Sequence, residues 1–362
     1  MRYWRKKTQV NKNGDIKPSP TSKFRIRLIT RNAVIRLAIL AVVLTALCLW
    51  GYYNMLVMPG KSYTGQLPAL TDAQILLSSE LALDVKKLAD EIGERNLIYY
   101  KELNDARDFI ERSLTEAGYE SHRQDYKAKG KTFYNIEAEK KGTKYPGEII
   151  IVGAHYDSSY GTSGANDNAS GVAATLALAR YFADKENMRT FRFVFFANEE
   201  PPFYHSDEMG SMVYAKSCRA KDDNIIAMFS LETIGYYSDK PNSQRYPPPF
   251  SLLYPSTGNF VGFLSNFGPS RELLYRAITS FRENCKFPSE GGAIPEVIVG
   301  INWSDHWSFW QYDYPAIMIT DTAPFRYTYY HEAEDTFDKI DYDKLARVVT
   351  GLGYVIVDLD QL

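Results

Sequence analysis

A polar loop that follows an apolar segment carries the first candidate functional residues of this 362-residue chain. Residues 148–154, Glu-Ile-Ile-Ile-Val-Gly-Ala, have the composition of a buried strand, and the loop after them contains His155, Asp157 and Asp167. From residue 171 onward the apolar residues have helical spacing. The three polar side chains therefore fall between a strand and a helix. In open α/β sheets, loops at the carboxyl ends of strands build binding sites.

Three further strand-like segments lead to acidic or imidazole side chains. These segments and their polar residues are 191–197 with Glu199 and Glu200, 226–231 with Glu232, and 315–320 with His331 in a tyrosine-rich loop. Four strand-like segments therefore each precede a possible ligand. The alternation of strands and helical segments favours an α/β fold.

The five histidine and carboxylate ligands in this set indicate a metal site. Two imidazoles and three carboxylates without a thiolate suit zinc, manganese or cobalt. If Asp167 bridges two metals, the remaining ligands are His155 and Glu232 on one metal, and His331 and Glu200 on the other. Two divalent ions against three carboxylates leave one net positive charge, enough to acidify a water molecule and attract an oxyanion. Glu199 is then free to act as a base.

Each piece of this pattern also has an ordinary structural interpretation. A His-x-Asp pair at a strand end is often a surface pair, an acidic pair at 199–200 is often a solvated turn, and Asp167 could cap the following helix. Their joint occurrence in chain order favours the metal site. His306 could line a pocket, hydrogen-bond toward the metals or cap a helix, and we favour a place beside the ligands. His122 and His205 are interpreted as ordinary loop or surface residues.

These residues resemble the di-zinc exopeptidase family that contains bacterial leucyl aminopeptidase, glutamate carboxypeptidase and the glutaminyl cyclases. The similarity covers about residues 80–362. Its motifs are His155-x-Asp157, Gly164-Ala-Asn-Asp167-Asn-Ala-Ser-Gly171, Asn198-Glu199-Glu200, Leu231-Glu232, Ser304-Asp305-His306, and His331 ahead of Glu334-Asp335-Thr336. Many relatives have Asp where this chain has Glu232, which leaves monodentate and bidentate binding open.

The resemblance implies a fold, a cofactor and roles for the site residues. The fold would be α/β, with a mixed, mostly parallel central sheet flanked by helices, and the apolar segment described next would add one transmembrane helix before it. Asp167 would bridge two Zn²⁺ ions, Glu199 would be the general acid/base, and Asp157 would orient His155. The zinc ligands would be His155, Asp167, Glu200, Glu232 and His331. The peptide bond between Asp167 and Asn168 would be cis.

An uncharged apolar segment near the N-terminus predicts a membrane anchor. Residues 37–58 contain no charged side chain, and 22 residues of helix rise about 33 Å, enough for a hydrocarbon core of about 30 Å. A cleaved signal peptide is the main alternative, but its charged region would be unusually long and no small-x-small cleavage site precedes Pro59-Gly60. Residues 1–36 carry eleven Lys or Arg and one acidic residue, so this tail is expected in the cytoplasm. The rest would lie outside the cytoplasm, as a single-pass protein of the cell membrane, and in the periplasm of a Gram-negative bacterium.

The residues after the anchor have the size of one large domain. A linker is expected at 59–78 and a zinc exopeptidase domain at 79–362. Outside the tail the chain has 31 basic and 43 acidic residues, and this net negative charge argues against a nucleic-acid partner. Cys218 and Cys285 could form a disulfide or remain buried thiols. The elements expected from period and composition are helices at 71–93, 103–117 and after Asp341, and an irregular loop at 236–267 at the rim of the site.

The combined pattern predicts a membrane-anchored aminopeptidase that removes residues from the free N-termini of peptides. Glu199 would take a proton from metal-activated water and return it to the leaving amine. The 27 tyrosines, several of them near His331, suggest an aromatic pocket and a hydroxyl donor to the oxyanion. Two alternatives stay open. A glutaminyl cyclase-like acyltransferase would hold one zinc and release pyroglutamate, and a non-enzymatic receptor-like domain would hold none.

Overall fold

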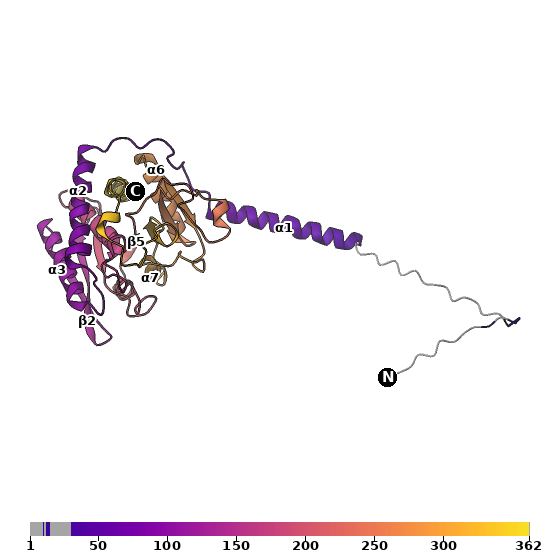
Figure 1. Ribbon diagram of the computed structural model, residues 1–362, viewed down its shortest axis with the longest axis horizontal. Coiled ribbons are helices and arrows are strands. Elements are labelled where there is room, and N and C mark those ends of the chain that lie inside the picture. Colours follow the sequence, from indigo (N-terminus) through magenta and orange to yellow (C-terminus); the bar gives the residue numbers. More distant parts are fainter. Residues whose placement is uncertain (1–9, 11, 15–29, 362) are drawn as a thin grey trace. The chain divides into compact units, whose positions relative to one another are not determined.

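The computed structural model describes residues 10, 12–14 and 30–361, and the chain divides into two compact units. The first unit, Met1–Gly51, contains most of helix α1 (Arg31–Met55), a helix with no buried residue (Figure 1). α1 is long and apolar enough to cross a membrane, and signal sequences share these two properties. The basic tail expected at residues 1–36 lies mostly outside the described residues.

The second unit, Tyr52–Leu362, is built on a sheet with helices packed around it (Figure 1). The eight described strands of this sheet have the order β1-β2-β4-β3-β5-β8-β6-β7. The strands are β1 (Ser121–Ala128), β2 (Lys131–Lys140), β3 (Tyr145–His155), β4 (Arg189–Phe196), β5 (Asn224–Glu232), β6 (Val261–Ser265), β7 (Ser289–Ala293) and β8 (Ala316–Thr320). β4, β3, β5 and β8 run parallel, and so do β6 and β7. β1 with β2, β2 with β4, and β6 with β8 are antiparallel. The predicted mixed, mostly parallel sheet is confirmed.

Helices cover both faces of this sheet. They are α2 (Asp72–Lys86), α3 (Tyr100–Glu116), α4 (Ser170–Phe182), α5 (Gly210–Ala220), α6 (Pro269–Asn284), α7 (His306–Trp310), α8 (Ala323–Arg326) and α9 (Tyr342–Gln361), with the short helices η1 (Lys87–Ile92), η2 (Ala165–Ala169), η3 (Phe250–Leu252) and η4 (Phe337–Lys339). In β3, Ile150 and Val152 belong to a core with residues of α2, α4 and α9, whereas Ile149 and Ile151 belong to a second core with α5 and α7. Successive side chains of a strand point to opposite faces, so a strand covered on both sides needs a continuous apolar run.

The segments predicted from their apolar pattern are present. The predicted strands 148–154, 191–197, 226–231 and 315–320 correspond to β3, β4, β5 and β8, and the predicted helices correspond to α2 with η1, α3 and α9. Thr71 caps α2 with a capping box, since its hydroxyl accepts the backbone N–H of Gln74. Residues 72–78, placed in a linker from the sequence, therefore lie in α2.

Four strands at the two edges of the sheet were missed. β1 reads Ser-His-Arg-Gln-Asp-Tyr-Lys-Ala and offers almost no apolar residue to a pattern search. β7 reads Ser-Glu-Gly-Gly-Ala, and β6 lies inside the stretch 236–267 that was predicted to be irregular. β1 and β7 form because neighbouring strands pair with them, and their own composition carries little signal. β2, Lys-Thr-Phe-Tyr-Asn-Ile-Glu-Ala-Glu-Lys, and β6, Val-Gly-Phe-Leu-Ser, do have strand-like residues and were overlooked.

The carboxyl ends of the central strands bring the candidate residues together at one edge. β3 ends at His155 and β5 at Glu232, while Glu199 and Glu200 follow β4 closely. In the ladder between β3 and β4, His155 is the partner of Phe196. The sheet therefore positions the backbone of these residues, independently of the loops that follow.

Candidate metal-dependent active site

The five predicted ligands form two groups that share one residue. Nε2 of His155 lies 3.2 Å from Oδ1 of Asp167 and 3.3 Å from Oε2 of Glu232. Nε2 of His331 lies 3.0 Å from Oδ2 of Asp167 and 3.2 Å from Oε1 of Glu200. Asp167 therefore presents one carboxylate oxygen to each group. The structure brings all five residues to the places that a bridging Asp167 requires.

The donor atoms of both groups fit a zinc ion. Ligands about 2.0 Å from a tetrahedral metal are separated by about 3.3 Å, close to the spacings observed here. Four buried donor atoms have no hydrogen-bond partner within the described part of the chain; they are Nδ1 and Nε2 of His155, Oδ1 of Asp167 and Oε1 of Glu200. Buried polar atoms without a partner are costly, and a bound cation would satisfy them. The residues thus suit two divalent ions of borderline softness.

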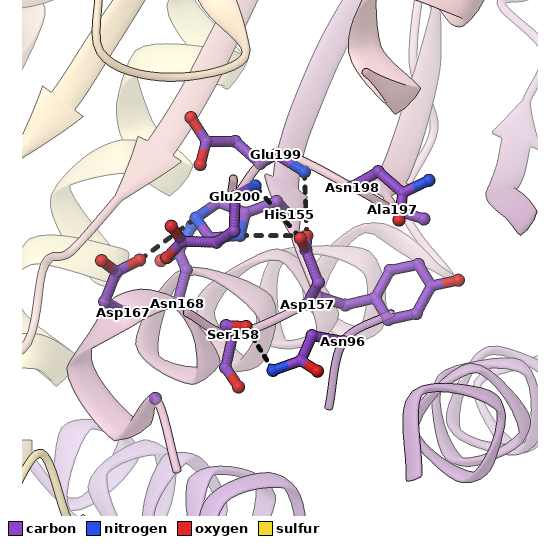
Figure 2. A network of polar contacts seen from close by, with 12 residues as sticks. Asn96, His155, Asp157, Ser158, Asp167, Asn168, Ala197, Asn198, Glu199 and Glu200 are labelled. Atoms are coloured by element: carbon purple, nitrogen blue, oxygen red, sulfur yellow. Dashed lines mark hydrogen bonds and ion pairs between the residues drawn. The ribbon is translucent and has the colours of Figure 1, made fainter. Parts of the chain in front are cut away.

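Asp157 connects the two strand ends of the site. Its two carboxylate oxygens accept the backbone N–H groups of Glu199 and Glu200, each at 3.1 Å. Oδ1 of Asp157 also lies 3.4 Å from Nδ1 of His155. In Figure 2 the backbone nitrogen of Glu199 faces Asp157, while its carboxylate extends away from Asp157. One side chain therefore holds both the imidazole and the acidic turn, as expected for a residue that orients His155.

The loop before α4 positions Asp167 through backbone contacts. Oδ2 of Asp335 accepts the N–H of Asp167 at 3.1 Å, and its Oδ1 accepts the N–H of Asn166 at 2.8 Å. The hydroxyl of Tyr327 donates to the same Oδ1 at 2.8 Å. The peptide bond between Asp167 and Asn168 is cis, which confirms that prediction. Asp335 therefore holds the backbone of Asn166 and Asp167 in place.

Glu232 has its own supports. Its Oε2 accepts the hydroxyl of Ser304 at 2.8 Å and the amide of Asn168 at 3.3 Å. The amide of Asn168 also donates to the carbonyl of Leu231. The longer side chain of Glu232 therefore still places an oxygen beside His155.

The site concentrates negative charge in a buried volume. Six carboxylates are nearly inaccessible to solvent: Asp157, Asp167, Glu199, Glu200, Glu232 and Asp305. Burial lowers the pKa of His331, but the stronger combined effect of Asp167 and Glu200 raises it to about 11. Burial raises the pKa of Glu232 to about 7, although His155 opposes the shift. Such a cluster binds cations strongly because each carboxylate otherwise stays uncompensated.

Glu199 differs from its neighbours because neither candidate metal group includes it. Burial raises the pKa of Glu199 well above its ordinary value; His155 opposes this shift, and the negative charges of Glu200 and Glu232 add to it. A carboxylate with a raised pKa can both accept and return a proton.

Comparison with known proteins identifies the family. Residues 135–356, more than half of the chain, match the model of peptidase family M28. The chain belongs to peptidase family M28. The uncharacterized protein YfbL of Escherichia coli (strain K12) is 38% identical over 285 residues, which are 75% of this chain and 85% of that protein.

Solved structures show the same fold. A zinc aminopeptidase from Bacillus subtilis matches with a TM-score of 0.63 and 13% identity, over 78% of this chain and 95% of that one. A glutaminyl cyclase from Bacteroides thetaiotaomicron, bound to N-acetylhistamine, matches with a TM-score of 0.59 and 20% identity, over 80% and 99%. The suspected family is confirmed, and the protein is a metallopeptidase.

Two further residues at the site of this peptidase escaped sequence reasoning. Arg95 is fully buried and donates to backbone carbonyls that include those of Tyr156 and Gly164. Burial lowers its pKa to about 10, while nearby carboxylates, Asp157 first, oppose that shift. The hydroxyl of Tyr204 is buried and has no hydrogen-bond partner among residues 30–361. Burial raises the pKa of Tyr204, and the charge of Glu199 adds to the effect, so its phenol stays protonated.

The remaining histidines have different surroundings. Nε2 of His306 lies 2.7 Å from the carbonyl oxygen of Ile301, and burial lowers the pKa of this histidine to about 4. His306 is therefore neutral and bound to the backbone. His205, interpreted from the sequence as an ordinary loop residue, stacks between Tyr204 and Trp307 with ring centroids 4.0 and 3.9 Å apart. The sequence could not predict this stacking, because Trp307 lies about a hundred residues from His205 along the chain.

An apolar pocket opens beside Glu232. Its volume is about 830 Å³ including the open mouth, and its lining includes Tyr246, Phe250, Tyr254, Ile294, Trp303 and Phe325. The loop 236–267, which the sequence predicted to lie at the rim of the site, supplies three of these six residues and so lines the pocket beside Glu232. Tyr330 also lines the pocket, directly before His331.

Proposed function

We propose that this M28 peptidase is a zinc-dependent aminopeptidase that hydrolyses the first peptide bond of peptides with a free N-terminus. The observation that carries the proposal is the pair of ligand groups joined at Asp167, with the carboxylate of Glu199 left over beside them. This arrangement provides ligands for two cations and leaves Glu199 free to act as a general base. The zinc aminopeptidases among the structural neighbours support it.

The five ligands would divide between two Zn²⁺ ions. Asp167 would contact both ions, with His155 and Glu232 on one side and His331 and Glu200 on the other. When bound, the ions would lower the pKa of a water molecule and polarise the scissile carbonyl.

The chain's own residues would handle the protons. We propose that Glu199 accepts a proton from the attacking water, holds it on its carboxyl group and donates it to the leaving amine. Its raised pKa suits the protonated intermediate form. Tyr204 and Tyr330 stay protonated because burial raises the pKa of each phenol. Both are therefore candidate donors to the developing oxyanion.

Two features of the site would select the substrate: the carboxylate charge near Glu199 and the apolar pocket beside Glu232. The two ions would offset the charge of the three ligand carboxylates, so the ammonium group of a free N-terminus would be attracted by carboxylates outside the ligand set, Glu199 among them, because opposite charges attract strongly away from water. The apolar pocket beside Glu232 would hold the side chain of the first residue. We therefore expect large apolar or aromatic N-terminal residues to be preferred.

The location of the enzyme is part of the same proposal. Residues 37–58 would anchor the chain in the cell membrane, residues 1–36 would lie in the cytoplasm, and the domain after the linker would lie outside it, as the excess of Lys and Arg before the span favours. Protease added to intact spheroplasts should then digest the domain. Digestion only in inverted vesicles would contradict the orientation.

A glutaminyl cyclase-like reaction is the second candidate, since a glutaminyl cyclase shares the fold. The ligand groups at His155 and at His331 are both complete, which argues for two metals and therefore for hydrolysis. Metal analysis of the purified full chain should give two zincs, and peptides with a free N-terminus should release amino acids whereas N-acetylated ones should not. Glu199→Gln is the matched inactive control, because it keeps the side-chain shape. One zinc with pyroglutamate as product would establish the cyclase instead, and a zinc-free chain would favour a receptor-like role.

A further inference from the structure

Two loops of the second unit expose large apolar side chains next to each other in the fold. Leu252 and Val297 are 85% and 84% exposed, and Leu253 and Val299 are 48% and 53% exposed. We call residues 249–253 and 295–299 the apolar rim. Phe250, within the first of these loops, and Ile294, directly before the second, pack into one buried cluster, and the hydroxyl of Tyr254 donates to the carbonyl of Gly291 at 2.8 Å. The two loops are therefore held together at their bases.

The segment that follows the candidate membrane span is fastened to the same region. Met55 and Leu56, both in the second unit, pack against the buried cluster that contains Phe250 and Ile294. Arg271 of α6 donates to the carbonyl of Asn54 at 2.8 Å, and Tyr275 donates to that of Val57 at 2.9 Å. Residues 54–57, at the start of the second unit, are therefore held beside the buried cluster that supports the rim.

We propose that the apolar rim is a membrane-contacting surface of the second unit. If α1 crosses a bilayer, residues 54–58 emerge at its surface and carry the rim with them. Burial of exposed apolar surface away from water is favourable, so the four Leu and Val side chains of the rim favour contact with lipid. Tyr52 and Tyr53, 46% and 61% exposed, add aromatic residues of the kind that membrane interfaces enrich.

The proposal has a consequence for the substrate. Val299 is both exposed and part of the pocket lining, so the pocket opens at the rim. A peptide held at the bilayer surface would then present its apolar N-terminal residue directly to the pocket. This inference rests on the membrane anchoring of the proposed function and adds where the substrate is captured.

Site-specific quenching in the full chain tests the contact. Leu252→Cys and Val297→Cys, each in a Cys48→Ser background, would carry an environment-sensitive fluorophore in phospholipid nanodiscs that contain nitroxide-labelled lipid. Ile98→Cys is the matched control: Ile98 is also an exposed apolar residue, at 69%, and Lys131 of β2 bonds to the adjacent Leu97 carbonyl at the far edge of the sheet from β7. We expect several-fold stronger quenching at residues 252 and 297 than at 98. Equal or absent quenching at the rim would overturn the proposal.

A probe on the natural Cys48 separates this proposal from the membrane anchor. Cys48 lies in α1, so a quenched probe there shows that the span is in the bilayer. Quenching at Cys48 without quenching at the rim refutes the contact and keeps the anchor, whereas no quenching at Cys48 refutes the anchor, and the rim proposal falls with it. A rim signal that depends on protein concentration and not on nitroxide lipid would assign the surface to a second copy of the chain, against the proposal.

Activity gives an independent readout. The double variant Leu252→Asp with Val297→Asp changes two exposed residues outside the ligand set, so hydrolysis of a short soluble peptide should persist at the unmodified rate. Hydrolysis of the same peptide tethered to a lipid should fall several-fold. An equal rate on the tethered peptide would contradict capture at the membrane surface.

Discussion

The two halves of the candidate metal centre are built differently. His155 is fully buried at the end of β3, and Asp157 lies against its second nitrogen. The side chain of His331 is 35% exposed on a loop, where its ring stacks on Tyr330 at 3.9 Å. The His155 half is fixed by the sheet and by buried hydrogen bonds, whereas the His331 half depends on a loop at the surface. We infer that the His155 half is preorganised and that the His331 half can exchange its metal more readily.

The largest effect on catalysis should come from the residue that belongs to neither half. Glu199→Ala should keep both metals and lose a factor of about 100 or more in kcat, the usual scale for general acid/base catalysis. Zinc content and turnover measured on the same preparation check this. If Glu199→Ala lost metal while Glu200→Ala retained both, the roles of the two neighbours would have to be exchanged.

Removal of one carboxylate from each half should sharpen the comparison. Glu200→Ala should release the His331-side metal and leave about one zinc per chain, because the other group keeps all its ligands. Glu232→Ala should weaken the His155 side, while Glu232→Asp should be tolerated as the shorter carboxylate of many relatives. Titration with a chelator, followed by metal analysis, gives the order of loss. Simultaneous loss of both metals in both variants would show that the two halves are not independent.

His306 offers a contrast with His155 and His331, the two histidines proposed as ligands, because the fold keeps His306 neutral. Its pKa of about 4 lies below the ordinary value of about 6.5, so the unfolded chain binds the proton more tightly between these pH values. Its contribution to stability is therefore complete above about pH 6.5 and falls as the pH drops toward 4. We expect a loss of about 2 kcal/mol between pH 6.5 and pH 5.

Denaturant unfolding of the metal-free chain at the two pH values measures this loss. His306→Gln is the matched control, since its amide can still donate to the carbonyl of Ile301 but does not titrate. The pH dependence should be smaller in the variant. The same dependence in both chains would assign the acid sensitivity to other groups.

Asp157 tests how much of the rigidity of both halves comes from outside the proposed ligand set, because it lies beside His155 and also binds the backbone of Glu200. Asp157→Asn replaces one of the two oxygens that accept the N–H groups of Glu199 and Glu200. Loss of such an outer partner of a metal ligand typically costs about 10–100-fold in metal affinity or activity. We expect the smaller of these losses, because one acceptor oxygen remains. An unchanged variant would remove Asp157 from the positioning network.

The parts of the molecule that were predictable are those with strong local signals. β3 could be predicted because both its faces are buried, so nearly every residue is apolar. His155, Glu199 and Glu232 could be placed because they follow such strands. β1 could not be predicted, because its pairing with β2 and not its composition makes it a strand. Arg95 and Tyr204 gave no signal either, since only tertiary structure shows that this guanidinium and this hydroxyl are buried and lie within range of carboxylate charges.

The ladder between β3 and β4 also sets the limits of variation in this protein. His155 stands opposite Phe196, and the acidic pair follows a few residues later. A one-residue insertion at the end of either strand would displace a ligand by about 3.3 Å along the chain and turn it to the opposite face. That step exceeds a zinc–ligand bond, so length changes should be rare in these two strands. Insertions should instead accumulate at β1 and β7, where no proposed ligand depends on the count of residues.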